Sequence, residues 1–448
     1  MNSDKKVYVG MSGGVDSSLT AALLVEQGYD VTGVYMKNWS KNLPGVKCPW
    51  ADDLADAKRV AVQLGIDFKV FDFENEYKQK VVDYMIDEYK NGRTPNPDIM
   101  CNQEVKFKLF LEAALEDGAD MIATGHYARV RHNSDLSDSL IFDETDASSI
   151  ISSERFRAGS DKGPDALSNS GSKCSEEIIA ESSASASVES SRSANIFSDT
   201  LEPESELTPG PSSDPERSSV SESISRKGEH NKGYLLQAVD ANKDQTYFLY
   251  RVTGEALGRT LFPIGEFTKP VVREMAAARG LTTAAKKDSQ GICFVGQVGI
   301  RDFLGMYVDQ KPGSIIDKKS GKVLGHHDGA IFYTIGQRHG LELGGGLPYY
   351  VVGKDMEKNE VYVTTDLNDK NLWRESIELA NVHWINDAPL EGEYDIRIRH
   401  RAPLMKARLS YIDNGVILEP KNAERAIAPG QSVVIYNGDI CLGGGIIV

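Results

Sequence analysis

The chain has 448 residues, of which 40% are hydrophobic and 26% charged, and its net charge is −16. It shows neither a signal peptide nor an apolar run of about 18 residues, so we expect no membrane span. Five cysteines are too few and too scattered for a disulfide scaffold, which favours a reducing, cytoplasmic setting. The length predicts two or three domains.

The negative charge is concentrated in residues 133–230, which account for −12 of the net −16. Of these 98 residues 28 are serine, and the only aromatic ones are Phe142, Phe156 and Phe197. Such a segment buries too little apolar surface to offset chain entropy, so we expect it to be disordered. We interpret it as an insertion tolerated in a surface loop; a regulatory or partner-binding segment is the alternative.

The first predicted element is a buried strand at 7–11, and a helix follows from Ser17 to Gly28. The turn between them is SGGVDS, Ser12–Ser17. Backbone amides and the positive end of the helix dipole converge on this turn, and its glycines let an anion approach the backbone. The turn therefore predicts a phosphate site, although it matches neither the Walker loop nor GxGxxG.

The rest of the first 130 residues alternates strands and helices. We expect strands at 30–35, 67–73 and 120–124, and helices at 52–64, 77–89 and 106–115. This alternation predicts an α/β fold with a doubly wound parallel sheet that binds ligands where its strands end. The segment ATGHYAR, residues 123–129, lies at such an end.

Ordered structure is expected to resume at Gly233, with the segments flanking the insert forming one hairpin split at its tip. A helix over 266–280 and a short strand or loop at 289–296 follow. From about residue 308, glycines separate short alternating strands, which predicts a small antiparallel β domain and then a barrel or sandwich. We expect a catalytic domain at 1–305 interrupted at 133–232, a central β domain at 306–372 and a C-terminal β-barrel domain at 373–448.

Seven motifs stand in a fixed order along the chain: SGGVDS, NPD followed by Cys101, TGHYAR, KDQTYFL, SQGICF, YTIGQR and GGG. Together they resemble the tRNA-specific 2-thiouridylase family of the ATP pyrophosphatase (PP-loop) superfamily. The resemblance covers nearly all of the chain outside 133–232. It implies an enzyme, a sulfurtransferase that adenylates the C2 oxygen of the wobble uridine (position 34) of tRNA with ATP and then replaces that oxygen with sulfur. AMP and pyrophosphate would be released, with Mg²⁺ as cofactor and a cysteine desulfurase or sulfur-relay protein as sulfur donor.

The same resemblance assigns the sulfur chemistry to two cysteines. Cys293 would carry the persulfide, and Cys101 would be its nucleophilic partner, both in polar, loop-forming stretches. An alternative is an iron–sulfur cluster held by Asp98, Cys101 and Cys293. Inert packing suits Cys48 and Cys441 better.

The nucleotide and tRNA sites carry over from the family in the same way. ATP would contact the loop and two strand ends: Gly10, Met11, Ser12, Gly13, Gly14, Val15, Asp16, Ser17, Met36 and Gly125, with Asp16 helping to hold Mg²⁺. The extruded uridine would be read by Asn96, Pro97 and Asp98. The tRNA path would be lined by His126, Lys243, Asp244, Gln245, Arg399, His400 and Gln431.

Three of these tRNA assignments have specific reservations. Many family members have tyrosine where His400 stands, and His126 could instead be a hydrogen-bonded histidine at a strand end. RIRHR would place Arg397, Arg399 and Arg401 on one strand face, either as a phosphate track or as a solvated basic face.

Other readings of the chain remain open. A PP-loop amide synthetase that uses ammonia would need no cysteine pair, and a thiolase acting on another tRNA position would show CxxC pairs or an added N-terminal RNA-binding domain. A non-catalytic RNA-binding or sulfur-carrier protein would have no need of Asp16, Cys101 and Cys293 together.

Overall fold

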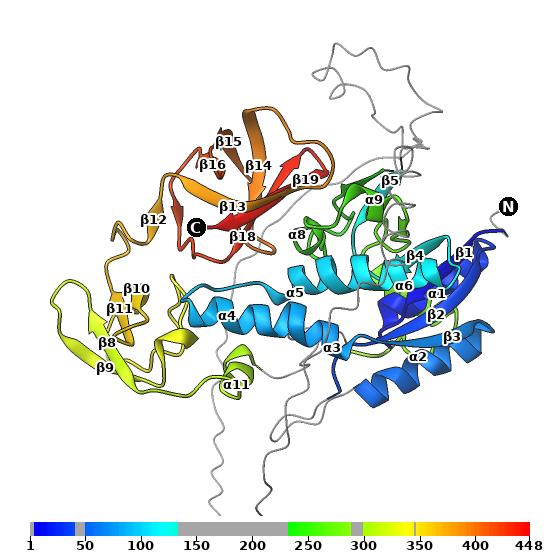
Figure 1. The fold of residues 1–448 in the computed structure, drawn as a ribbon, viewed down its shortest axis with the longest axis horizontal. Coiled ribbons are helices and arrows are strands. Elements are labelled where there is room, and N and C mark those ends of the chain that lie inside the picture. The colour runs from blue at the N-terminus through cyan, green and yellow to red at the C-terminus, as the bar shows by residue number, and fades with distance from the viewer. Residues whose placement is uncertain (1–3, 41–49, 133–231, 288–298, 345) are drawn as a thin grey trace, which may run out of the picture. The chain divides into compact units, whose positions relative to one another are not determined.

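A computed structural model describes residues 4–40, 50–132, 232–287, 299–344 and 346–448. Its first sheet is parallel throughout and has the strand order β3-β2-β1-β4-β7. The strands are β1 Lys6–Gly10, β2 Asp30–Lys37, β3 Asp67–Asp72, β4 Met121–Thr124 and β7 Thr260–Leu261. Figure 1 shows β1, β2 and β3 side by side in the blue part of the chain.

Helices cover both faces of this sheet because the side chains of β1 alternate between two cores. Val7 and Val9 pack with α1, α2 and α10, whereas Tyr8 packs with the helices of residues 74–90 and 97–116. This is the doubly wound parallel sheet expected from the alternating pattern. The helices are α1 Val15–Glu26, α2 Trp50–Leu64, α3 Glu74–Tyr77, α4 Tyr84–Lys90, α5 Pro97–Met100, α6 Phe110–Glu116 and α10 Lys269–Ala278, with π-helical segments η1 Lys78–Asp83 and η2 Cys101–Leu109.

The segments on either side of the insert do form one antiparallel hairpin. β5, Arg129–His132, pairs with β6, Gly233–Leu236, in the register His132↔Gly233. The expected split hairpin is therefore confirmed. β6 also pairs with β19, Ile440–Ile447, so the hairpin extends the sheet of the C-terminal region. Two short helices, α8 Thr246–Leu249 and α9 Gly254–Leu257, follow it.

The C-terminal region is a closed antiparallel barrel of six strands. Its order is β13-β16-β15-β14-β18-β19, and β13 pairs back to β19. Alternate residues of these strands, among them Leu379, Ile396 and Leu409, fill the interior. The strands are β13 Ile377–Trp384, β14 Gly392–Arg397, β15 Met405–Ile412, β16 Gly415–Pro420, β18 Ser432–Asn437 and β19.

Between the parallel sheet and the barrel in sequence, the chain forms a four-stranded sheet of order β10-β11-β8-β9. The pairing of β8 with β11 is parallel, which the antiparallel pattern expected from the sequence did not include. The strands of this four-stranded sheet are β8 Gly313–Asp317, β9 Val323–His327, β10 Tyr350–Asp355 and β11 Glu360–Thr364. Helix α11, Ile300–Leu304, precedes the sheet, and the 3₁₀ turn η5, Ala330–Phe332, follows β9. A separate two-stranded pair joins β12, Trp373–Arg374, to β17, Glu424–Arg425.

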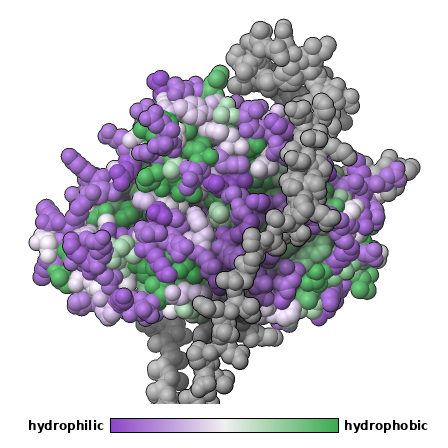
Figure 2. Space-filling model, in the orientation of Figure 1, coloured by the Kyte–Doolittle hydropathy of each residue, from purple (hydrophilic) through white to green (hydrophobic). Residues whose placement is uncertain are grey.

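Within the described residues, no helix has both the length and the apolarity needed to cross a membrane. On the face drawn in Figure 2, hydrophilic residues separate the hydrophobic ones into patches.

Candidate active site

The turn after β1 has the geometry of an anion-binding loop. Gly13 has φ +73°, and a Cβ there would overlap the backbone carbonyl of Asp53 in α2. Gly14 precedes α1 as its N-cap, and no side chain caps that helix end. The first amides of α1 therefore lack the side-chain acceptor that a serine or aspartate cap would supply, which leaves them suited to a ligand anion.

Three serine hydroxyls brace this loop from within. Ser18 donates to the carbonyl of Gly14 at 2.8 Å, and the Ser17 hydroxyl accepts from the Ser12 amide at 3.1 Å. Ser12 is exposed, whereas Ser17 and Ser18 are buried. Of Ser12 and Ser17, both expected to contact ATP, Ser12 is the one that the loop exposes to solvent.

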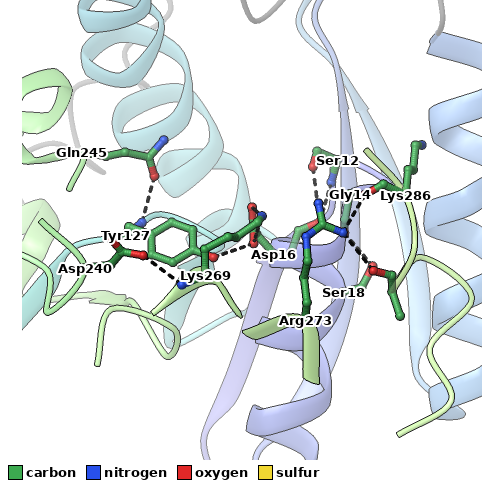
Figure 3. A network of polar contacts seen from close by, with 12 residues as sticks. Ser12, Gly14, Asp16, Ser18, Tyr127, Asp240, Gln245, Lys269, Arg273 and Lys286 are labelled. Carbon is green, nitrogen blue, oxygen red and sulfur yellow. Dashed lines mark hydrogen bonds and ion pairs between the residues drawn. The ribbon is translucent and has the colours of Figure 1, made fainter. Parts of the chain in front are cut away.

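Asp16, in the first turn of α1, binds two donors that the sequence analysis did not predict. Its carboxylate accepts from the Lys269 ammonium at 2.8 and 2.9 Å and from the Tyr127 hydroxyl at 2.9 Å. Figure 3 shows both side chains meeting at Asp16 beside the loop. The Lys269 amide in turn donates to Asp240 at 2.9 Å, so this buried lysine is fixed at both its ends.

Gly125 and Met36 lie at the ends of β4 and β2, next to the loop. A Cβ on Gly125 would come within 2.7 Å of the Ser17 amide nitrogen, so only glycine lets β4 end this close to α1. The Met36 side chain lies against Gly10 and packs on the core. Both positions agree with the ATP assignment in location, and direct contact with ATP stays a prediction.

Further basic residues hold the chain segment beyond α10 against α2. Lys286 forms ion pairs with Asp53 at 2.8 Å and Asp56 at 2.6 Å. Arg273 of α10 donates to the carbonyls of Ala284 and Lys286, both at 3.0 Å. These contacts fasten residues 284–286 beside the phosphate loop (Figure 3).

Cys101 does not lie in a loop, which corrects the expectation from its polar neighbours. It begins η2 within a helix that runs from Pro97 to Glu116, and it is fully buried in the hydrophobic core. Cys293 and Cys48 lie outside the described residues. Cys441 is buried in β19, where burial raises its thiol pKa, as expected for an inert packing cysteine.

The segment expected to read the uridine docks onto the barrel. The Thr94 amide donates to the carbonyl of Pro429 at 2.9 Å, and the Gln431 side chain donates to the carbonyl of Thr94 at 2.7 Å. Asn96 caps the helix that begins at Pro97, because its side chain accepts from the Asp98 amide at 3.1 Å. Gln431 thus positions residues 94–98 from the barrel side.

His126 is buried rather than facing a channel. Its Nδ1 lies 2.8 Å from the Thr124 hydroxyl, and its ring packs against Phe107 and Phe262. Burial, and secondarily the charge of Lys106, holds the His126 pKa well below its usual value, so the imidazole is neutral. This placement matches the alternative of a hydrogen-bonded histidine at a strand end.

The expectation that RIRHR places Arg397, Arg399 and Arg401 on one strand face is wrong, because β14 ends at Arg397. The Arg397 guanidinium is buried and donates to Asp244 at 2.7 Å, and both side chains are less than 10% exposed. Arg399 follows the strand and binds backbone carbonyls of Arg425 and Ala426, whereas Arg401 lies in a turn with φ +63°. The three arginines therefore do not share a strand face.

Asp244 mainly joins its own segment, residues 238–246, to β14 of the barrel, and we call this contact the internal joint. Asp244 also accepts from the Ala238 amide at 3.0 Å and the Thr246 hydroxyl at 2.8 Å. The Gln245 side chain accepts from the Tyr127 amide at 2.8 Å, and Lys243 is partly exposed. Of the KDQ residues expected to line the tRNA path, Asp244 is the one whose side chain lies in the interior.

His400 packs on an aromatic residue of the catalytic region. Its ring lies 4.5 Å from that of Phe248 and also contacts Tyr247. Burial, and then the charge of Arg401, lowers the His400 pKa to about 4, so a salt bridge to phosphate at neutral pH is disfavoured. A neutral imidazole can still stack or hydrogen-bond.

Taken together, the parallel sheet and the glycine-lined loop at an uncapped helix end define a doubly wound α/β protein with a loop suited to an anion and an appended β-barrel. Family models match three stretches: a "tRNA methyl transferase HUP domain" at residues 5–148 and 221–297, a "tRNA methyl transferase PRC-barrel domain" at 301–365 and an "Aminomethyltransferase beta-barrel domain" at 374–447.

Proteins named tRNA-specific 2-thiouridylase MnmA from Bacillus mycoides (strain KBAB4) and Bacillus cereus (strain Q1) are each 38% identical over 445 residues, covering 98% of this chain and 94% of theirs. The chain belongs to the tRNA-specific 2-thiouridylase family. A solved structure described as a predicted subunit of tRNA methyltransferase from Methanocaldococcus jannaschii covers 27% of this chain and 53% of its own, with 24% identity and a TM-score of 0.21, which is too low to inform the argument.

Sequence reasoning missed Lys269, Tyr127 and Arg273. Tyr127 lies inside the quoted TGHYAR motif, yet nothing in that motif predicts a bond to Asp16. Lys269 stands between Thr268 and Pro270, a position that signals only a helix start. The available signal was chemical: a cation placed at the positive end of a helix needs an explanation.

Proposed function

We propose that the chain is a tRNA-uridine 2-sulfurtransferase. It adenylates the C2 oxygen of the wobble uridine (position 34) with ATP and then replaces that oxygen with sulfur, releasing AMP and pyrophosphate. The observation that carries the proposal is the likeness, over nearly the whole chain, to relatives named tRNA-specific 2-thiouridylase. The glycine-lined loop supplies the anion site that such a reaction needs.

ATP would bind where β1 meets α1, with Gly10–Ser17, Met36 and Gly125 around it. The amides at the start of α1 would hold the polyphosphate, because no side chain caps them. The Asp16 carboxylate fits Mg²⁺, which prefers oxygen ligands, although its present donors would have to yield an oxygen. When bound, Mg²⁺ would neutralise phosphate charge.

Adenylation joins the uracil C2 oxygen to the α-phosphorus and breaks the bond from that phosphorus to the bridging oxygen of pyrophosphate. The loop amides stabilise the charge that accumulates on the departing pyrophosphate. The enzyme otherwise positions the base, since a uridine stacked in the anticodon cannot reach ATP until it is extruded. Asn96, Pro97 and Asp98 are proposed to hold it.

Sulfur transfer is proposed to use Cys293 as persulfide carrier and Cys101 as nucleophile. The Cys101 thiolate attacks the Cys293 sulfur, a disulfide forms, and hydrosulfide is released to attack C2 and expel AMP. A thiol reductant must then restore both cysteines. Cys101 is fully buried in the described arrangement, so the helix around it has to give access before it reacts.

The remaining parts of the proposal concern tRNA and organisation. Direct tRNA contact is proposed for the residues that are exposed or partly exposed, which are Lys243, Gln245, Arg399, His400 and Gln431. The buried His126 and Asp244 would act through the groups they hold. The proposal includes a catalytic domain at 1–305, a central one at 306–372 and a barrel at 373–448. A sulfur-donor protein and a reducing, cytoplasmic setting complete it; an iron–sulfur cluster at Asp98, Cys101 and Cys293 is not favoured.

The direct test is mass spectrometry of tRNA nucleosides after incubation with enzyme, ATP, Mg²⁺, unmodified tRNA and a sulfide or persulfide donor. Thiolated uridine is the expected product, and its absence under all donor conditions would contradict the proposal. With the persulfide donor, Cys101→Ser and Cys293→Ser should each abolish thiolation while ATP binding persists. Cys441→Ser is the matched control, because this second buried cysteine packs in the barrel sheet and should be dispensable.

A further inference from the structure

Thr94, which lies between α4 and α5, is held by two other parts of the chain. Its amide donates to the carbonyl of Pro429 at 2.9 Å, and its carbonyl accepts from the Gln431 side chain at 2.7 Å, both next to β18 of the barrel. Its hydroxyl lies 3.1 Å from that of Thr334, which follows η5. All three polar groups of Thr94 therefore contact elements outside the doubly wound domain.

Thr334 is fixed in turn by contacts of its own motif, YTIGQR, residues 333–338. Its amide donates to the Gln337 side chain at 3.0 Å, and the carbonyl of the residue before it accepts from the Lys354 ammonium at 2.9 Å. Gly336 has φ +84°, and a Cβ there would overlap a side chain of the segment between β17 and β18. The motif, which has no role in the proposed function, thus forms a rigid support for Thr94.

Two prolines carry the position of Thr94 to the residues proposed to hold the uridine. Pro95 and Pro97 each have a fixed φ, and each restricts the backbone of the residue before it. The helix that carries Cys101 begins at Pro97. With so few soft torsions in between, a shift of Thr94 is passed on to Asn96–Asp98 rather than absorbed.

We propose that Thr334 is a positioning residue for the uridine site and acts through Thr94. The inference rests on the proposed function and gives the region of the four-stranded sheet a part in it. The barrel holds the backbone of Thr94, and Thr334 holds its side chain. Without the hydroxyl contact the uracil C2 would be presented less precisely, which slows both adenylation and sulfur transfer and leaves the ATP loop unchanged.

The test is single-turnover thiolation by the full chain at saturating ATP and tRNA, with a persulfide donor. Thr334→Val removes the hydroxyl but keeps the branched shape, and the rate should fall about three- to tenfold, as for one hydrogen bond. Thr334→Ser should restore the rate, and ATP affinity should stay within about twofold in both variants. Thr364→Val is the matched control, because this threonine of β11 accepts from the amide of Asp366 in its own region. A contact that only stabilises the fold would lower the urea midpoint of Thr334→Val and leave its rate at saturation unchanged.

Thr94→Val removes the same contact from the other side and should slow thiolation to a similar extent. The double variant should be no slower than either single one, since one shared contact is lost. A thiolation rate of Thr334→Val within about twofold of that of Thr364→Val overturns the inference.

Hydrogen exchange of the chain without tRNA, followed by mass spectrometry, gives a measurement that does not depend on activity. The amides of residues 96–101 should exchange faster in Thr334→Val than in Thr364→Val, because their anchor is loosened. Equal exchange in the two variants also overturns the inference. If the wild type forms no thiolated uridine, the proposed function fails, and the exchange comparison alone decides whether Thr334 positions this segment.

Discussion

Asp244→Ala should destabilise the protein strongly, although its sequence context suggested a residue facing tRNA. The side chain is 1% exposed and bonds to Arg397 at 2.7 Å, so its removal leaves a buried guanidinium without its counter-ion. Breaking one partner of a buried pair costs about 3–5 kcal/mol. The Arg397 guanidinium also lies 5.4 Å from the centre of the Tyr436 ring, but this cation–π contact cannot replace a carboxylate.

The exposed pair Arg129–Asp439 is the matched control. It also joins the hairpin to the barrel, at 3.1 Å, but its side chains are 26% and 50% exposed. Surface pairs of this kind contribute about 0–1 kcal/mol. Urea unfolding of Asp439→Ala should therefore shift the midpoint several times less than that of Asp244→Ala.

A double variant separates the ion pair from the residues that form it. Replacing both partners, as Asp244→Leu with Arg397→Met, should cost less than either single change, because no buried charge is left over. If Asp244→Ala unfolds at the same urea concentration as Asp439→Ala and instead loses tRNA affinity, the internal-joint reading is refuted. In that case Asp244 would face the tRNA path.

Two other residues give predictions of the same kind. Gly13→Ala should abolish ATP binding in calorimetry, because its φ of +73° and the nearby Asp53 carbonyl both exclude a side chain. Gly28→Ala is the control, since Gly28 has a φ of +81° but open space around it. This change should cost only about 1 kcal/mol of stability and leave ATP binding intact. Burial lowers the His400 pKa to about 4 from a usual value near 6.5, so the stability it contributes above pH 6.5 should be lost as the pH falls toward 4. His400→Phe cannot be protonated, and the drop in its urea midpoint from pH 7 to pH 5 should be smaller than in the wild type; an equal drop would contradict this.

The local sequence predicted the elements whose signal is periodic and short-range. β1, β2, α1 and the split hairpin follow from apolar runs, glycines and alternation, and the structure has them within a few residues. The turn between β1 and α1 followed from Gly13 and Gly14 in the same way, and phosphate binding there stays a prediction. In each case the residues that determine the conformation are neighbours in the chain.

The sequence misled where a polar stretch was taken to be a loop. RTPNPDIMCNQEVKF reads as polar and proline-rich, but Asn96 and Pro97 are a helix cap and first turn. A helix beginning at residue 97 therefore carries Cys101 into the core. Recognising the cap would have moved the predicted helix start from 106 to 97.

At two other misjudged positions, Asp244 and Asp16, the partners lie far away in sequence. Asp244 and Arg397 are 153 residues apart, and Asp16 and Lys269 are 253 apart. A charged residue in a motif looks solvated until its counter-ion is known, and no pattern within a motif supplies that counter-ion. The two pairs differ in exposure. The side chains of Asp244 and Arg397 are 1% and 9% exposed and balance each other inside the protein, which suits a joint, whereas that of Asp16 is 30% exposed beside the glycine-lined loop, which suits contact with a ligand.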